Sequence, residues 1–155
     1  MCETERCDFE LFKSNVCHKL KRLGDKPFIA ETLKTNEVQM YFDRKWWGIQ
    51  NLDWTGYFIK MNQFVSIDQL LDDDVFFSYD CTITYPIMGA FTDWMISTYG
   101  IECYLKFYKQ ENTKDAIKQI YNKTPKEMNQ SFIDYINLFR IDEVVEQRMD
   151  ALFKE

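Results

Sequence analysis

The chain has 155 residues, of which 46% are hydrophobic and 17% are aromatic. This length is typical of one domain, and the apolar content is ample for a continuous core, which argues against intrinsic disorder. The net charge of −6 argues against direct binding of nucleic acid, because a phosphate backbone requires an excess of lysine and arginine on one face. A protein is therefore the expected partner.

The first residues and the cysteines favour a cytoplasmic protein without membrane contact. The opening MCETERCDFE lacks a basic segment that leads into an apolar one, and the longest uncharged stretch, around Cys81 to Phe91, is interrupted by Thr, Tyr, Pro and Gly. Five cysteines without a CxxC pair suit neither a disulfide framework nor a zinc knuckle. A reducing compartment fits this composition.

The sequence predicts one mainly α domain over residues 1–155, which forms a compact helical bundle with frayed ends. No Pro/Gly/Ser-rich linker and no internal repeat divides the sequence. Apolar residues from Phe9 to Leu23 recur at three- and four-residue steps and predict a first helix that ends at Gly24. A second helix is predicted from Pro27 to about Asp43.

The middle segment, residues 44–80, is irregular and rich in aromatic residues. We predict short helices joined by loops there, one of them beginning with Ser66 and Gln69 as a capping box. Pro86 is predicted to lie in the first turn of the next helix, which ends at Gly100. That helix is the expected central core element, with apolar positions Ile87, Phe91, Trp94, Met95 and Tyr99.

Local signals also mark the helices of the C-terminal third. An apolar stripe follows Gly100, formed by Ile101, Tyr104, Leu105 and Tyr108. Asn112 is predicted to cap the next helix. Thr124, Pro125 and Glu127 supply an N-cap, an N1 proline and an N3 acceptor, which predict a further helix start. Its apolar face is predicted at Met128, Phe132, Ile136 and Phe139, and a last segment at Ile141, Val145, Met149 and Leu152.

Motifs for catalysis are largely missing from the sequence. His18 is the only histidine, which excludes two-histidine zinc sites, and its neighbour Cys17 points about 100° away on a helix, so the two cannot form a catalytic pair. Neither GxGxxG nor GxxxxGK followed by Ser or Thr occurs. The sequence therefore favours a protein that is not an enzyme.

Charge is distributed unevenly along the chain. Residues 61–105 contain no Lys, Arg or His, and the carboxylates within this stretch that we select as a candidate binding face are Asp68, Asp72, Asp73, Asp74 and Asp80. Such a face can steer a basic partner. Alternatively, Lys and Arg from the terminal helices fold over it and offset its charge. The run at residues 72–74 reads as a solvated loop more readily than as a pair of acid/base carboxylates.

The segment from Tyr85 to Phe139 resembles the C-terminal helical half of the gluzincin-type zinc metallopeptidases of the MA-like clan. In that family an apolar helix begins with a Tyr that is followed, after three residues, by Gly, by Ser or Ala, and by Phe. A Tyr-Gly pair comes next, then a helix that ends in Phe-Tyr or Leu-Tyr. A short helix and a capped final helix complete the pattern. The residues that match this pattern are Tyr85, Gly89, Ala90, Phe91, Tyr99, Gly100, Phe107, Tyr108, Thr124 and Glu127. Gly89 fits two further interpretations: close approach of a neighbouring helix, or a simple helix-interior glycine.

The resemblance extends upstream to Glu31 but stops short of a complete zinc site. The stretch Pro27 to Glu31 is similar to the strip that carries the family's third zinc ligand, with Thr32 in place of its glycine. The HExxH motif is missing, and only Glu31 and His18 remain as metal-ligand candidates, so we expect no bound metal and no cofactor. The resemblance implies a degenerate scaffold without the reaction.

Three functions follow from these observations. The first is a non-catalytic binding or regulatory protein, such as an inhibitor that presents its acidic face to a basic, nucleic-acid-handling enzyme. The second is a zinc hydrolase fragment completed by a partner chain, or thiol chemistry at one of the cysteines. The third is a structural module that assembles with itself through aromatic surface. The first is the hypothesis that the sequence favours.

Overall fold

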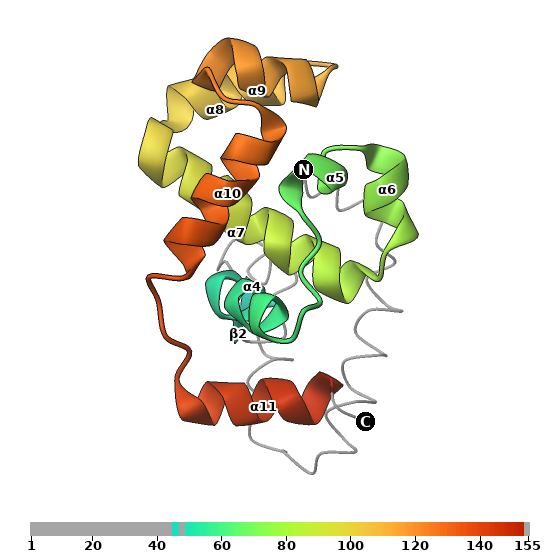
Figure 1. Ribbon diagram of the computed structural model, residues 1–155, viewed down its shortest axis with the longest axis vertical. Helices are drawn as coiled ribbons and strands as arrows, with labels where there is room; N and C mark the ends of the chain where they lie inside the picture. The colour runs from blue at the N-terminus through green and yellow to red at the C-terminus, as the bar shows by residue number, and fades with distance from the viewer. Residues whose placement is uncertain (1–44, 47–48, 154–155) are drawn as a thin grey trace.

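The computed structural model describes residues 45–46 and 49–153, and within them the protein is mainly helical, as predicted (Figure 1). The hairpin strands β1 (Lys45–Trp46) and β2 (Ile49–Gln50) pair antiparallel. The helices are α4 (Asn51–Lys60), α5 (Ile67–Leu70), α6 (Asp73–Ser78), α7 (Cys81–Tyr99), α8 (Ile101–Tyr108), α9 (Thr113–Tyr121), α10 (Pro125–Ile136) and α11 (Glu143–Phe153). The two helices predicted before residue 44 lie outside the described residues.

Helix α7 is the central element of the described region, as its apolar spacing predicts. It runs through the middle of the view in Figure 1 and packs against α4, α5 and α8, while α10 packs against α4, α5 and α9. Phe91 and Trp94 of α7 are 1% and 4% exposed, and both rings contact Phe132 of α10 at centroid distances of 5.4 Å. The core therefore lies between α7 and α10.

Helix α4 is a core helix in a segment that the sequence predicted as irregular. Trp54, Tyr57 and Phe58 stand three and four positions apart, so they share one helix face, and all three are fully buried. Their rings contact Phe153 of α11, which holds that last helix against α4. The prediction of short helices is confirmed for α4, α5 and α6, but it did not include the β1–β2 hairpin or the fully buried aromatic face of α4.

The predicted start of the central helix is also wrong. Helix α7 begins at Cys81, and Pro86 lies inside it. Asp80 caps this earlier start: its carboxylate accepts hydrogen bonds from the Thr82 amide at 2.9 Å and from the Thr82 hydroxyl at 2.8 Å. A proline in the second turn removes one backbone donor, and the strong cap together with burial of Pro86 outweighs that loss.

Other predicted boundaries agree with the structure. Gly100 ends α7 with a φ of 88°, a conformation that favours glycine, and Asn112 caps α9 through the Asp115 amide at 3.1 Å. Both hydrogen bonds of the Thr124 capping box form. The Glu127 backbone amide donates to the Thr124 hydroxyl at 3.2 Å, and the Thr124 backbone amide donates to the Glu127 carboxylate at 2.7 Å. Ser66 begins α5, but its hydroxyl donates to the Gln69 side chain at 3.1 Å and makes no cap.

Apolar side chains at two predicted stripes face solvent. Met128, Phe132 and Ile136 of α10 are buried as predicted, whereas Phe139 lies beyond the helix end and is 48% exposed. On α8 the predicted stripe is largely exposed, and Phe107 supplies the buried position.

No helix among the described residues has both the length and the apolar character required to cross a membrane.

Gly89 of α7 packs directly against the side chain of Asn51, the first residue of α4. A Cβ atom built at this position would overlap the side-chain nitrogen Nδ2 of Asn51 and lie 3.2 Å from Asn51 Cγ. The Asn51 side chain thus occupies the space where a Gly89 side chain would be. Of the two structural interpretations of this glycine, close approach of a neighbouring helix is the correct one.

Candidate interaction surface

The five carboxylates predicted as a binding face come from α5, α6 and the cap of α7. Asp73 and Asp74 occupy the first turn of α6, and Asp72 is its N-cap, accepting from the Asp74 and Val75 amides at 3.0 and 3.3 Å. The prediction of a loop for residues 72–74 is therefore corrected to a capped helix start. Negative charge is favoured there because the amides of a first turn point outward.

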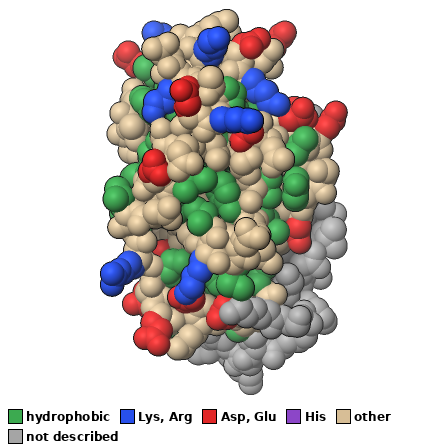
Figure 2. All heavy atoms as spheres, in the orientation of Figure 1, with side chains coloured by type: hydrophobic (Ala, Val, Ile, Leu, Met, Phe, Trp, Pro, Cys, Tyr) green, Lys and Arg blue, Asp and Glu red, His purple; other side chains and the backbone are tan. Residues whose placement is uncertain are grey.

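Most of the acidic side chains on this face are exposed, and none forms an ion pair with another described residue. Asp72, Asp73, Asp74 and Asp80 are exposed, and Asp68 is half-buried. The ion pair formed in the described region joins Lys60 to Glu146, at the α11 side of the molecule, and none of the five carboxylates has a cationic partner among residues 49–153. Figure 2 shows acidic side chains at the upper right edge, over α6, and basic side chains interspersed with acidic ones at the top, over α8 and α9.

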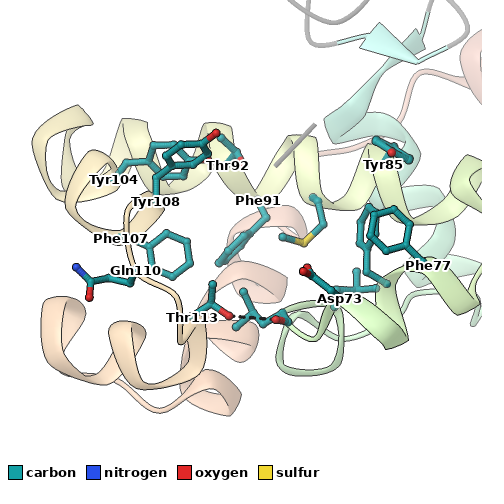
Figure 3. A pocket seen from close by; sticks show the side chains of 14 residues that line it. Asp73, Phe77, Tyr85, Phe91, Thr92, Tyr104, Phe107, Tyr108, Gln110 and Thr113 are labelled. Atoms are coloured by element: carbon teal, nitrogen blue, oxygen red, sulfur yellow. Dashed lines mark hydrogen bonds between the residues drawn. The ribbon is translucent and has the colours of Figure 1, made fainter. Parts of the chain in front are cut away.

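A pocket opens beside this acidic edge, between α6, α7, α8 and the turn after α8 (Figure 3). Its cavity volume is about 140 Å³. The lining consists of ten hydrophobic or aromatic side chains and four polar ones: Leu70, Leu71, Phe76, Phe77, Tyr85, Met88, Phe91, Tyr104, Phe107, Tyr108, Asp73, Thr92, Gln110 and Thr113. Hydrophobic and aromatic lining side chains together with a few polar groups are typical of ligand sites.

The pocket is held in shape by the core beneath it. Leu70, Phe91 and Phe107 in its wall are buried, and the Thr113 hydroxyl donates to the Leu71 carbonyl at 3.0 Å, which ties the start of α9 to the end of α5. Burial raises the pKa of Tyr104 in the same wall, and a hydrogen bond from Thr92 opposes that effect. The phenol is therefore a neutral hydrogen-bonding group at physiological pH.

Asp73 joins the pocket to the acidic face. Figure 3 shows its carboxylate turned toward the cavity and Phe91, whereas the Gln110 amide points away. The lining contains no Lys, Arg or His, so this carboxylate is the one charged group around the cavity within the described residues. The local field therefore favours a cation at the mouth of the pocket.

Exposed apolar side chains surround the pocket mouth. Phe77 and Tyr108, which line it from opposite sides, are each 49% exposed. Leu105 and Ile101 continue the apolar surface along α8, at 46% and 50% exposed. Large exposed apolar areas with a polar rim are typical of protein interaction sites. The sequence showed the stripe on α8 but did not show that it faces outward, so the pocket was missed.

Metal-binding clusters are not found in the described part of the chain. No group of three or more His, Cys, Asp and Glu side chains there is placed to hold a metal ion. Burial raises the pKa of Tyr121 to about 12, with nearby Cys103 adding to the shift, so this phenol does not serve as a base at neutral pH. The metal-ligand candidates His18 and Glu31 lie outside the described residues.

Known proteins add no assignment to this surface. Comparison of the chain with protein-family models, with curated protein sequences and with solved structures gives no match. The function of the protein is therefore argued from its own residues, and within the part of the chain that the structure describes, the surface formed by α5, α6, α7 and α8 combines a cavity, exposed carboxylates and exposed aromatic side chains.

Proposed function

We propose that the chain is a non-catalytic binding protein that occupies a basic surface of a protein partner through its acidic face. The observation that carries this proposal is the cluster of exposed carboxylates Asp72, Asp73 and Asp74, which have no cationic partner among the described residues and lie beside exposed aromatic side chains. A stable fold has little need for such a combination, since exposed like charges repel and exposed rings are not buried.

The physical effect of the acidic face is to steer and orient the partner. Complementary charge increases the association rate and suppresses binding of acidic competitors, whereas the neighbouring apolar side chains supply the buried area that sustains the complex. A surface that attracts lysine and arginine competes with a nucleic-acid backbone for the same residues. Inhibition of a basic, nucleic-acid-handling enzyme in the cytoplasm is therefore the regulatory role we propose.

The scaffold for this role is proposed to be a degenerate metallopeptidase-like helical fold. Support comes from the sequence pattern of Tyr85 to Phe139. Zinc analysis of the purified full chain separates this proposal from a zinc peptidase. Stoichiometric zinc together with peptide hydrolysis that is lost in Glu31→Gln would contradict it.

The proposal is tested by affinity capture with a charge-reversed chain. The variant carries Asp73→Lys and Asp74→Lys and keeps Asp72, because Asp72 caps α6. We expect the wild type to recover a basic protein from its native host in stoichiometric amounts, and the variant to lose it. The recovered protein should bind nucleic acid less well when the wild-type chain is added, and salt should weaken the complex.

A matched control reverses the same number of charges elsewhere. Asp134 on α10 and Glu143 in the first turn of α11 are exposed carboxylates outside the acidic face. Asp134→Lys with Glu143→Lys changes the net charge equally and should leave the captured protein unchanged. Equal capture by both double variants, or equal loss in both, would show that the acidic face does not select the partner.

A further inference from the structure

The pocket between α6, α7 and α8 has the capacity of a single aromatic ring. Its cavity volume is about 140 Å³, and an apolar cavity of roughly 150 Å³ is known to take up benzene. Its inner wall is made by Leu70, Phe91 and Phe107, which are 3%, 1% and 7% exposed. Because these side chains also belong to the core, little ordering is required when a ligand enters.

We infer that this pocket receives an aromatic side chain of a partner polypeptide that carries lysine or arginine next to that side chain. The inference rests on the proposed function, since it names the part of the basic partner that the acidic surface binds. Charge complementarity supports it: the Asp73 carboxylate lies at the cavity, and no basic side chain lines it. The nearest lysine on α8, Lys106, is turned about 200° from Tyr104 and so faces away from the pocket.

The arrangement of rings around the cavity suits an aromatic guest. Phe76 contacts Phe77 edge-to-face at 5.0 Å and 85°, and contacts Tyr85 at 5.3 Å and 73°. An additional ring between this group and the rings of α8 can make the same edge-to-face contacts. The flanking cation can lie over an exposed ring face while it approaches Asp73.

The apolar surface beyond the cavity indicates a polypeptide as the source of the ring. Leu105 and Ile101 extend the exposed surface along α8 away from Tyr108, each about half exposed. A ligand of one ring fills the cavity and leaves this extension uncovered, whereas a chain that continues past its aromatic anchor covers it. A free aromatic amine therefore uses only part of the surface.

The test is a titration of the full chain with short capped peptides, followed by NMR chemical shifts. The probe is acetyl-Gly-Lys-Phe-Lys-Gly-amide, and its controls replace Phe by Ala or both Lys by Glu. We expect the Ala peptide to bind roughly tenfold or more weakly, because a buried ring is lost. The Glu peptide should also bind more weakly, and benzylamine should bind less tightly than the probe.

Two variants of the protein place the binding site. Phe77→Ala removes one wall of the mouth, and its matched control Phe139→Ala removes a ring of nearly equal exposure, 48% against 49%, that does not line the pocket. We expect only Phe77→Ala to weaken probe binding severalfold. Asp73→Asn should weaken it about two- to fivefold, as expected for an exposed charge pair. Circular dichroism establishes that each variant is folded.

Several results would overturn the inference. Equal binding of the Phe and Ala peptides would exclude the ring site, equal binding of the Lys and Glu peptides would exclude the cation, and benzylamine as tight as the probe would exclude a polypeptide source. Self-association of the chain that Phe77→Ala abolishes would make a second copy the occupant. Capture that still depends on Asp73 and Asp74 while no peptide binds would overturn the pocket and leave the acidic-face proposal standing.

Discussion

Gly89 illustrates at the scale of one residue how two helices fix each other's side chains. Substitution by alanine should destabilise the protein by about 1 kcal/mol, the low end for an overpacked site, because the new methyl group overlaps the amide end of the flexible Asn51 side chain, which must move, and lies 3.2 Å from its Cγ atom. The higher helix propensity of alanine offsets part of this loss. Urea denaturation of wild type and Gly89→Ala measures the effect.

The control is the other helical glycine, Gly56. A Cβ atom there would meet Ile141 Cδ1 at 3.5 Å, which is ordinary van der Waals contact. Gly56→Ala should therefore be neutral or stabilise the protein by about 0.5–1 kcal/mol. In an Asn51→Ala background the cost of Gly89→Ala should disappear. Equal destabilisation by the two glycine substitutions would contradict the specific role of Gly89.

At the scale of the elements, two carboxylates at helix beginnings have pKa values shifted in opposite directions. Burial, and then the charge of Asp142, raise the pKa of Asp53 in the first turn of α4. At the start of α10, hydrogen bonds from the backbone amide and the side chain of Thr124 lower the pKa of Glu127. A carboxylate in the first turn of a helix can therefore have its pKa raised or lowered, depending on its burial and its hydrogen bonds.

These shifts predict opposite pH dependences for two neutral variants. A raised pKa means that ionised Asp53 destabilises the folded state, so Asp53→Asn should be more stable than wild type at pH 7, with the difference shrinking as pH falls through the raised pKa. A lowered pKa means that ionised Glu127 stabilises the fold. Glu127→Gln should be less stable at pH 7, and this difference should begin to shrink below the unfolded-state pKa and vanish once the pH falls below the lowered folded-state pKa. Thermal melts from pH 7 to pH 3 measure both; parallel pH profiles would contradict the assignment.

On the scale of the whole molecule, Trp94 joins two helices, α7 and α10, in the core. Its ring lies 5.8 Å from Phe91, 5.4 Å from Phe132 and 6.3 Å from Tyr135. Trp94→Ala should cost about 3–5 kcal/mol of unfolding free energy, because the cavity it leaves separates α7 from α10. Tyr79→Ala removes an exposed aromatic side chain and should change stability by no more than about 0.5 kcal/mol. Comparable losses in urea denaturation of both variants would contradict this core.

By itself the sequence determined those features that depend on neighbouring residues. The helix starts at Asn112 and Thr124 and the stop at Gly100 were predicted correctly, because a cap or a positive φ is set by chemistry within one turn. The acidic binding face selected from the lack of basic residues between 61 and 105 stays a prediction; within the described residues its five carboxylates come from neighbouring elements and none forms an ion pair.

Only the tertiary structure decided which faces are buried and where the cavity lies. The periodicity of α8 predicts an apolar stripe, but a stripe packs inward or remains exposed according to what its neighbours cover, and here Phe107 turns inward while Leu105 and Tyr108 stay outside. The pocket is built from α5 to α8 and the turn that follows, and its shape depends on their packing angles. Such angles follow from the sum of many weak side-chain contacts, which local sequence spacing does not encode.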